Sequence, residues 1–370
     1  MFLKKLGGVL ATCLLSMVPL VMPAATAQTP SCHVWNGIGD LQTIVNTYAC
    51  VELVPGTYLR TTLLKIPTNH TIRGQTGQRS TTIVRATTPW QEPWYSWREP
   101  LVEIAAGGTA IGFTIDAANI STNGVSGDKY TVDNVAILNA HCDGADIGGP
   151  GVTIRNSLIA YNGSNCTETG IPGGAIYSQR TNGYPDYNYA PLIENNVIRD
   201  NGGPALDING TWGGTFRNNT VSGNQHWAAV SLFGASYWHI ENNTITHAAT
   251  NDTVPQNTAH SQCIGGPSGG HSAGIWLCQV NDTNNFVTIG NVITGNVVQG
   301  WYGILAIGND ETQPYWAPRL NTFQYNNVLG STHGCADDFN VGPTSPWYTE
   351  RNVWTGNNCV GTPNTGPTFF

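Results

Sequence analysis

Charged residues are scarce in this 370-residue chain, because Asp, Glu, Lys and Arg together make up only 10% of it. Basic residues are the rarer kind, since 15 of them stand against 23 acidic residues. An acidic chain repels the phosphates of nucleic acids and anionic membrane surfaces. We therefore expect no nucleic-acid partner and no membrane partner. The same charge disfavours polyanionic sugars unless a cation bridges them.

Long apolar runs are missing as well, except at the start of the chain. Lys4 and Lys5 precede an apolar stretch, 6–22, and small residues at 24–27 then offer a cleavage site. This is the pattern of a secretory signal peptide. We expect residues 1–27 to be that signal peptide and residues 28–370 to be a single domain. We expect the mature protein to be soluble, to be exported to the periplasm or the extracellular space, and to be a monomer.

The chain has no Cys-x-x-Cys spacing, which argues against a zinc site. Beyond the signal peptide the number of cysteines is even, and in an exported chain this favours disulfides. Spacing alone leaves their pairing open. The cysteines in question are Cys32, Cys50, Cys142, Cys166, Cys263, Cys278, Cys335 and Cys359.

Helical periodicity is also absent, and short β-type segments recur in its place. One series includes "VTIRNSLIAYNG", "PLIENNVIRDNGG", "GTFRNNTVSGNQ" and "WHIENNTITHAA", and equivalent apolar positions lie 23 residues apart (Ile193 to Phe216) or 24 apart (Phe216 to Ile240). Between them runs a second series: "GAIYSQ", "PALDIN", "AAVSLF", "AGIWLC" and "YGILAI". Periods of this size predict a solenoid with at least two strands in each turn. Its 37 Asn residues should mostly form ladders and left-handed bends.

These Asn-rich units, with "VPGTYLRTTLLKIPTNHTIRGQ" before them, resemble right-handed parallel β-helix proteins of the pectate-lyase-like superfamily over roughly residues 51–358. The resemblance implies an all-β fold, a single-stranded right-handed parallel β-helix with long loop insertions on one face. The superfamily includes polysaccharide lyases, glycoside hydrolases, epimerases and adhesins, so the fold does not decide the activity. Because sequence neighbours are spatial neighbours in a solenoid, we expect sequential disulfides: Cys32–Cys50, Cys142–Cys166, Cys263–Cys278 and Cys335–Cys359.

Three long excursions interrupt the period, at 87–99, 162–190 and 248–272. Insertions in a solenoid commonly lie on one face and build its binding surface.

The second series predicts a column of outward side chains. If Ile176, Leu206, Val230, Ile275 and Ile304 face the core, the residue after each one faces solvent and lines a shallow groove. These neighbours are Tyr177, Asp207, Ser231, Trp276 and Leu305. One turn earlier, Asp146 should join the same column, and Asp337 or Asp338 should reach it after the last full turn.

Asp207 and Asp146 are the predicted catalytic carboxyls. They should lie two turns apart, with about 9–10 Å between their backbones, near the carboxyl spacing of an inverting glycosidase. His226 and His271 precede strands of this column and are candidates for proton exchange. The predicted substrate-binding residues are Tyr177, Gln179, Arg180, Asn209, Trp212, Ser231, Phe233 and Trp276.

Three functions remain open at this point. The first is a glycoside hydrolase on a neutral polysaccharide, which needs no cofactor. The second is a polysaccharide lyase or epimerase on uronate chains, which would use Ca²⁺ held by Asp143, Asp146, Glu168 and Asp207. The third is a non-catalytic glycan-binding surface protein. The acidic charge and the aromatic lining favour the hydrolase.

Overall fold

The computed structural model describes most of the unit Cys32–Phe370. The predicted signal peptide and several stretches between strands lie outside the described residues. Those described are 31–88, 99–163, 166, 173–179, 190–225, 228–247, 272–279, 287–308, 318–337 and 350–359.

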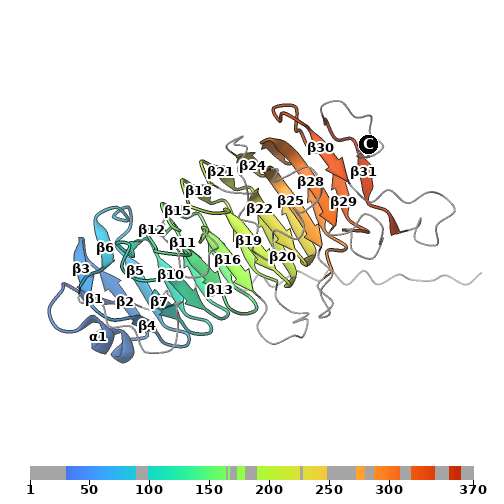
Figure 1. Ribbon diagram of the computed structural model, residues 1–370. Helices are drawn as coiled ribbons and strands as arrows, with labels where there is room; N and C mark the ends of the chain where they lie inside the picture. The colour runs from blue at the N-terminus through green and yellow to red at the C-terminus, as the bar shows by residue number, and fades with distance from the viewer. Residues whose placement is uncertain are drawn as a thin grey trace, which may run out of the picture. The chain divides into compact units, whose positions relative to one another are not determined.

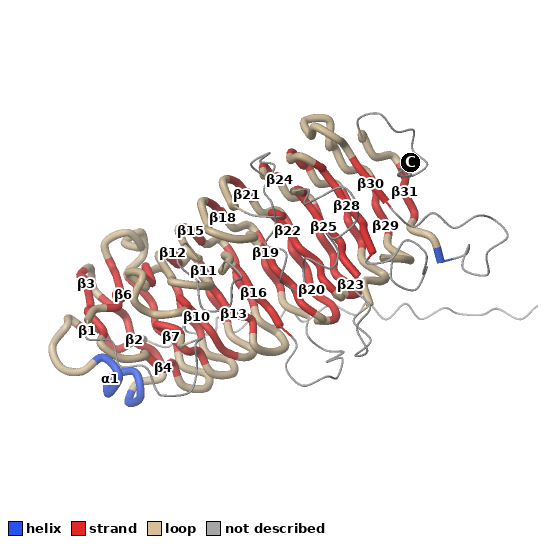
Figure 2. The backbone as a smooth tube through the Cα atoms, in the orientation of Figure 1, coloured by secondary structure: helices blue, strands red, loops and turns tan. Residues whose placement is uncertain are grey.

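Strands predominate among these residues, and they form three parallel sheets (Figures 1 and 2). Sheet A has twelve strands: β1 (His33–Trp35), β2 (Cys50–Leu53), β5 (Thr71–Gly74), β8 (Thr109–Ile111), β11 (Thr131–Asp133), β14 (Thr153–Arg155), β17 (Leu192–Glu194), β20 (Trp212–Arg217), β23 (Ser236–Glu241), β26 (Val292–Thr294), β29 (Thr322–Gln324) and β31 (Val353–Thr355). Sheet B has nine: β3 (Gly56–Arg60), β6 (Thr82–Ala86), β9 (Thr114–Asp116), β12 (Ala136–Leu138), β15 (Leu158–Ala160), β18 (Val197–Arg199), β21 (Thr220–Ser222), β24 (Thr244–Thr246) and β27 (Val297–Gln299). Sheet C has ten: β4 (Leu64–Ile66), β7 (Pro100–Ile104), β10 (Asn123–Gly127), β13 (Ala145–Ile147), β16 (Ile176–Gln179), β19 (Leu206–Asn209), β22 (Ala228–Phe233), β25 (Ala273–Gln279), β28 (Tyr302–Gly308) and β30 (Cys335–Asp337).

Each coil visits sheet A, then sheet B, then sheet C before the next coil begins. A strand therefore pairs in parallel with its equivalents one coil before and one coil after. Ile154 of β14, for example, pairs with Val132 of β11 and with Ile193 of β17. This arrangement is a single-stranded parallel β-helix, and it confirms the predicted solenoid.

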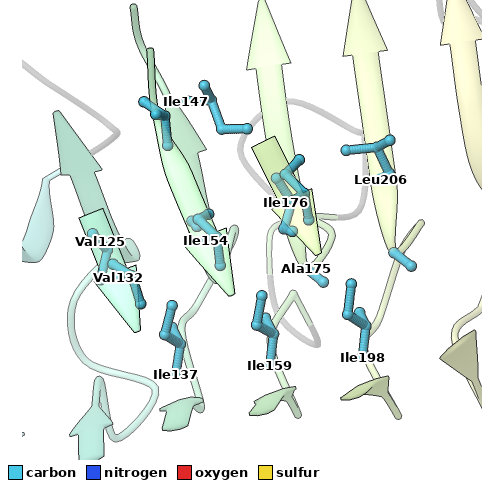
Figure 3. Packing of buried hydrophobic residues seen from close by; sticks show 14 of the residues in the cluster. Val125, Val132, Ile137, Ile147, Ile154, Ile159, Ala175, Ile176, Ile198 and Leu206 are labelled. Carbon is cyan, nitrogen blue, oxygen red and sulfur yellow. The ribbon is translucent and has the colours of Figure 1, made fainter. Parts of the chain in front are cut away.

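The core lies between the three sheets and consists of stacked aliphatic side chains. Figure 3 shows inward residues of sheets A, B and C meeting there, including Val132, Ile137, Ile154, Ile159 and Ile176. All five are fully buried. Alternate residues of a strand point to opposite faces of its sheet, so the same alternation that fills this core also determines which side chains point outward.

The one described α-helix, α1 (Leu41–Thr47), packs against β2 and β4 and buries Leu41 and Val45. Asp40 caps it by accepting a hydrogen bond from the Thr43 backbone N–H at 2.9 Å. Partial burial acts to raise the pKa of Asp40, but hydrogen bonds from Thr43 and Arg60 outweigh it and hold the pKa below its usual value. No described helix has the length and hydropathy needed to cross a membrane.

Asparagine ladders fill the bends, as predicted. At the turn from sheet A to sheet B, the Asn219 side chain accepts hydrogen bonds from the backbone and side-chain N–H groups of Asn196, at 2.9 and 3.0 Å. Its own Nδ2 donates to Asn243 Oδ1 and to the carbonyl of Ile193. The residue before each ladder position has a left-handed backbone, as Asn218 does with φ of 55°. An Asn-Asn pair therefore combines one left-handed bend with one ladder position.

Disulfides join three of the predicted cysteine pairs: Cys32–Cys50, Cys142–Cys166 and Cys335–Cys359. Cys278 is also disulfide-bonded. Its predicted partner, Cys263, lies outside the described residues. The first and third of these bonds tie the two terminal parts of the described solenoid to their neighbouring strands.

The long connections all adjoin sheet C in the chain. Stretches outside the described residues either precede a sheet C strand (89–98, 164–165, 167–172, 226–227 and 248–271) or follow one (180–189, 280–286, 309–317 and 338–349). By contrast, the described turns from sheet A to sheet B are short: only Asn195 and Asn196 separate β17 from β18. The three predicted excursions therefore all adjoin strands of sheet C, the sheet that carries Asp207.

Candidate functional site

The predicted outward column exists, and strand register aligns its members. Asp146 of β13 pairs with Tyr177 of β16, and Tyr177 pairs with Asp207 of β19. Asp207 pairs in turn with Ser231 of β22, and Ser231 pairs with Trp276 of β25. Leu305 of β28 follows Trp276. We call this row the outer column of sheet C.

Glycine determines how these strands enter the sheet. A Cβ added at Gly144, just before β13, would lie 2.8 Å from Ile159 Cγ2 and 2.7 Å from the carbonyl oxygen of Ala175. Any larger residue would therefore force the bend away from sheet B. At the other end of β19, Gly210 has φ of 66° and ends the strand. The sequence "GGPALDING" thus contains a short strand that ends at a left-handed glycine.

Register also extends the column toward the N-terminus, with residues that sequence reasoning missed. Ser126 of β10 pairs with Asp146, Glu103 of β7 pairs with Ser126, and Lys65 of β4 pairs with Glu103. Lys65 Nζ lies 3.3 Å from Glu103 Oε2. The alternation of Val102 and Ile104 inward with Glu103 outward was a usable signal for this extension. The described column carries three carboxyls, and its one lysine is paired to one of them.

The expectation that the column faces solvent is wrong for its C-terminal half. Glu103 keeps 42% of its side chain exposed, and Asp146 and Tyr177 are partly exposed. Beyond them, exposure falls to 3% at Asp207, 0% at Ser231, 1% at Trp276 and 2% at Leu305. Alternation tells which face of a sheet a side chain leaves from. It does not tell whether other parts of the chain cover that face.

Two hydrogen-bond donors in the covered half have no partner among the described residues. They are the hydroxyl of Ser231 and the indole N–H of Trp276, and both polar atoms are buried. A buried donor without a partner costs about 1–3 kcal/mol, so such groups commonly mark places where water or a ligand completes the structure. These two lie in directly paired positions of β22 and β25.

A second outward row runs beside the first, two residues further along each strand. It contains Gln179, Asn209, Phe233 and Cys278, which are paired in that order. Asn209 is 9% exposed and Phe233 is 7% exposed. Of Gln179 the structure describes the backbone only. The amide of Asn209 therefore lies on the same face of β19 as the carboxyl of Asp207.

The predicted Ca²⁺ ligands do not come together within the described residues. Asp143 Oδ1 accepts a hydrogen bond from the Gly174 backbone N–H at 2.8 Å, so this carboxyl serves the turn before β16. Asp146 and Asp207 lie two strands apart, and Glu168 lies outside the described residues. No group of three His, Cys, Asp or Glu side chains in the described part of the chain can hold a metal ion. The three predicted ligands that the structure describes therefore do not form a calcium site by themselves.

Four other predicted site residues are not part of the outer column as described. His226, His271 and Arg180 lie outside the described residues. Trp212 begins β20 of sheet A, past the bend that ends β19, and its ring lies edge-on to Tyr237 at 5.6 Å. The structure does not bring Trp212 to the outer column.

Asp337 was one of two residues, with Asp338, expected in the outer column, and the structure excludes Asp337 from it. It pairs with Ala306, a core residue, so its side chain belongs to the inward row. Its Oδ2 accepts a hydrogen bond from Trp354 Nε1 at 2.7 Å. The register places Ala336 beside Leu305 instead. Asp337 therefore ties the last coil together and takes no part in the column. Asp338 lies outside the described residues.

Comparisons with known proteins support the fold. The family model described as "Right handed beta helix region" matches residues 162–336. ORF18 of Geobacillus virus E2 superposes with a TM-score of 0.53 at 13% identity, over 87% of this chain and 57% of its own. This chain thus spans little more than half the length of the viral protein. An alginate lyase from Paenibacillus sp. str. FPU-7 superposes with a TM-score of 0.51 at 16% identity, over 84% of this chain and 92% of its own. No curated protein matches the sequence.

Proposed function

For a chain that folds as a right-handed parallel β-helix of the pectate-lyase-like type, we propose the activity of a polysaccharide lyase on uronate chains. The observation that carries the proposal is the row Asp146–Tyr177–Asp207, in which a phenol lies in register between two carboxyls. This row lies on the sheet that all the long connections adjoin, where a solenoid builds its binding surface. The similar fold of an alginate lyase agrees with this choice.

A lyase breaks a uronate chain by β-elimination. The C5 proton leaves, its electron pair forms the C4–C5 double bond, and the bond from C4 to the glycosidic oxygen breaks. That oxygen then takes up a proton. The reaction needs a group that can accept and return a proton, and donors that hold the carboxyl beside C5.

The residues of sheet C can fill these roles. Tyr177 takes the C5 proton on its phenol oxygen while its own proton passes to Asp207 in the next strand. Asp207 returns that proton to the phenol as Tyr177 protonates the glycosidic oxygen. Asn209, on the same face as Asp207, offers N–H groups to the substrate carboxyl. Asp146, at the open side of the row, accepts hydrogen bonds from sugar hydroxyls. No step of this proposal uses a metal ion.

Inverting glycoside hydrolysis is the second candidate, because Asp146 and Asp207 lie two strands apart with about 9–10 Å between their backbones. Such an enzyme places a water and the sugar between its carboxyls. Tyr177 occupies the register position between them, which is why the hydrolase takes second place.

The three disulfides between described cysteines and the leader-like start of the chain support action outside the cytoplasm, by a protein that we propose to be a monomer.

A substrate panel tests the function. Purified protein is incubated with alginates, pectates and neutral polysaccharides, while unsaturated uronate absorbance, reducing ends and the C5 configuration of the polymer are followed. The proposal expects unsaturated ends from a uronate polymer, with turnover at least about 100-fold lower in Asp207→Asn. Asp133→Asn, the same change on sheet A, is the matched control. Reducing ends without unsaturation indicate a hydrolase, C5 inversion without cleavage an epimerase, and binding alone a non-catalytic protein.

A further inference from the structure

The outer column of sheet C is open at one end and closed at the other. From Glu103 to Tyr177 its side chains are at least partly exposed. From Asp207 onward they are buried, and this holds across four consecutive strands, β19, β22, β25 and β28. The change occurs between Tyr177 and Asp207, in the middle of the row that we assign to the reaction.

The open part is long enough for a short stretch of polysaccharide. Four inter-strand steps separate Lys65 of β4 from Tyr177 of β16. At about 4.8 Å per step, they span roughly 19 Å along the column. On the far side of Asp207, the closed part continues with Ser231, Trp276 and Leu305, and a chain lying along the column cannot pass.

The closed end also carries the two unpartnered donors. Ser231 is the first residue beyond Asp207, and Trp276 is the second. Their hydroxyl and indole N–H are buried without a partner among the described residues. Sugar hydroxyl and ring oxygens are acceptors of the kind that these donors lack. Continuous polysaccharide would have to cross this point, whereas a chain end can stop at it.

We propose that the enzyme acts on chain ends. The polysaccharide enters along the open side, its terminal residue stops against Ser231 and Trp276, and the bond that breaks lies over Tyr177 and Asp207. This inference rests on the proposed function and specifies its mode, because the products are then short sugars removed one after another from a terminus.

The product profile of the wild-type protein tests the mode. A size series of oligosaccharides cut from the polymer identified by the panel is digested, and products are separated at early times. Release from a chain end predicts one short product from the first time point, slow loss of polymer viscosity, and no cleavage of oligosaccharides chemically blocked at the recognised terminus. A spread of intermediate lengths with a rapid fall in viscosity overturns the inference and leaves the proposed function standing. No product from any polymer overturns both.

A conservative variant tests the closed end itself. Trp276→Phe removes the indole N–H and keeps an aromatic wall, so KM for short oligosaccharides should rise about 3- to 10-fold. Trp238→Phe is the matched control, because its Nε1 is likewise buried and without a partner among the described residues, but the residue lies in the core beneath sheet A. KM values that are equal in the two variants contradict the assignment of Trp276. The wild-type product profile decides the mode even if either variant folds poorly.

Discussion

At the scale of single residues, the account depends on Tyr177 and its two neighbours. A phenol beside a carboxyl group can donate its own proton to that group while it accepts a second proton from the substrate. The register places one carboxyl group on each side of Tyr177. We assign the proton transfer to Asp207, which is 3% exposed and lies at the covered side of Tyr177. Asp146 remains partly exposed and better suited to binding sugar hydroxyls.

Tyr177→Phe should therefore lower kcat by about 100-fold or more, since general acid–base groups commonly contribute that much. KM should change little, because the ring that contacts the sugar remains. Steady-state kinetics on the uronate polymer measure both constants. Tyr325→Phe is the control: this tyrosine is 67% exposed and lies at the turn that follows β29 of sheet A. A Tyr177→Phe enzyme within two-fold of wild type would remove Tyr177 from the mechanism.

The sequence was sufficient to align this row and insufficient to describe its surroundings. Alternation around Ile176 and Leu206 predicted the outward direction of Tyr177 and Asp207, because strand geometry has a period of two. It failed at Trp276, which was expected to be exposed and is 1% exposed, because alternation does not tell whether the outer face of a sheet is covered. It also failed at Asp337, one of the two candidates from the last coil, because Ala336 and not Asp337 pairs with Leu305.

At the scale of elements, the bends explain the unusual asparagine content. An Asn at a ladder position is fully buried and uses both ends of its amide, as Asn219 does with Asn196 and Asn243. The residue before it is exposed and needs only a left-handed backbone. Gly295 and Gly356 fill that role in later coils, with φ of 65° and 66°. Two adjacent asparagines thus have different tasks, and sequence repetition alone could not separate them.

This difference can be measured with a matched pair of variants. Asn219→Gly leaves the N–H groups of Asn196 and the carbonyl of Ile193 without partners, and it should lower the free energy of unfolding by about 3 kcal/mol. Asn218→Gly places at the bend a residue that other coils already use, and it should stay within about 0.5 kcal/mol of wild type. Urea unfolding followed by circular dichroism gives both values. An equal loss of unfolding free energy in the two variants would mean that the ladder hydrogen bonds of Asn219 do not contribute measurably to stability.

At the scale of the whole molecule, each coil contacts only its neighbours, so stability is passed along the stack coil by coil. Among the described residues, the first and last coils have a neighbouring coil on one side only. Disulfides compensate at both places, since Cys32–Cys50 joins the first strands and Cys335–Cys359 joins the last ones. In the chain-entropy account, closing a loop of this length stabilises by about 3.5 kcal/mol.

Replacing Cys335 and Cys359 together by alanine should therefore loosen one end only. Hydrogen exchange should accelerate in β29, β30 and β31 and stay near wild type in β16 and β19. The Cys32→Ala, Cys50→Ala protein should show the opposite pattern, with faster exchange in β1 and β2. Acceleration spread evenly over all coils in either variant would show that the solenoid unfolds as a unit and contradict this description.

The solenoid and three of its cysteine pairs were predictable, because the same local sequence pattern recurs in every coil and places sequence neighbours side by side. The site was only partly predictable, since it depends on single residues and on what covers them. The strand register links the fold to the site, because it aligns Asp146, Tyr177 and Asp207 of successive coils in one row.

The most direct measurement is a crystal structure of the Asp207→Asn protein with a uronate oligosaccharide of the substrate found by the panel. We expect sugar density along the outer face of β13, β16 and β19, with the terminal residue against Ser231 and Trp276. Sugar bound only over sheet A or sheet B, with the outer column of sheet C empty, would contradict the account.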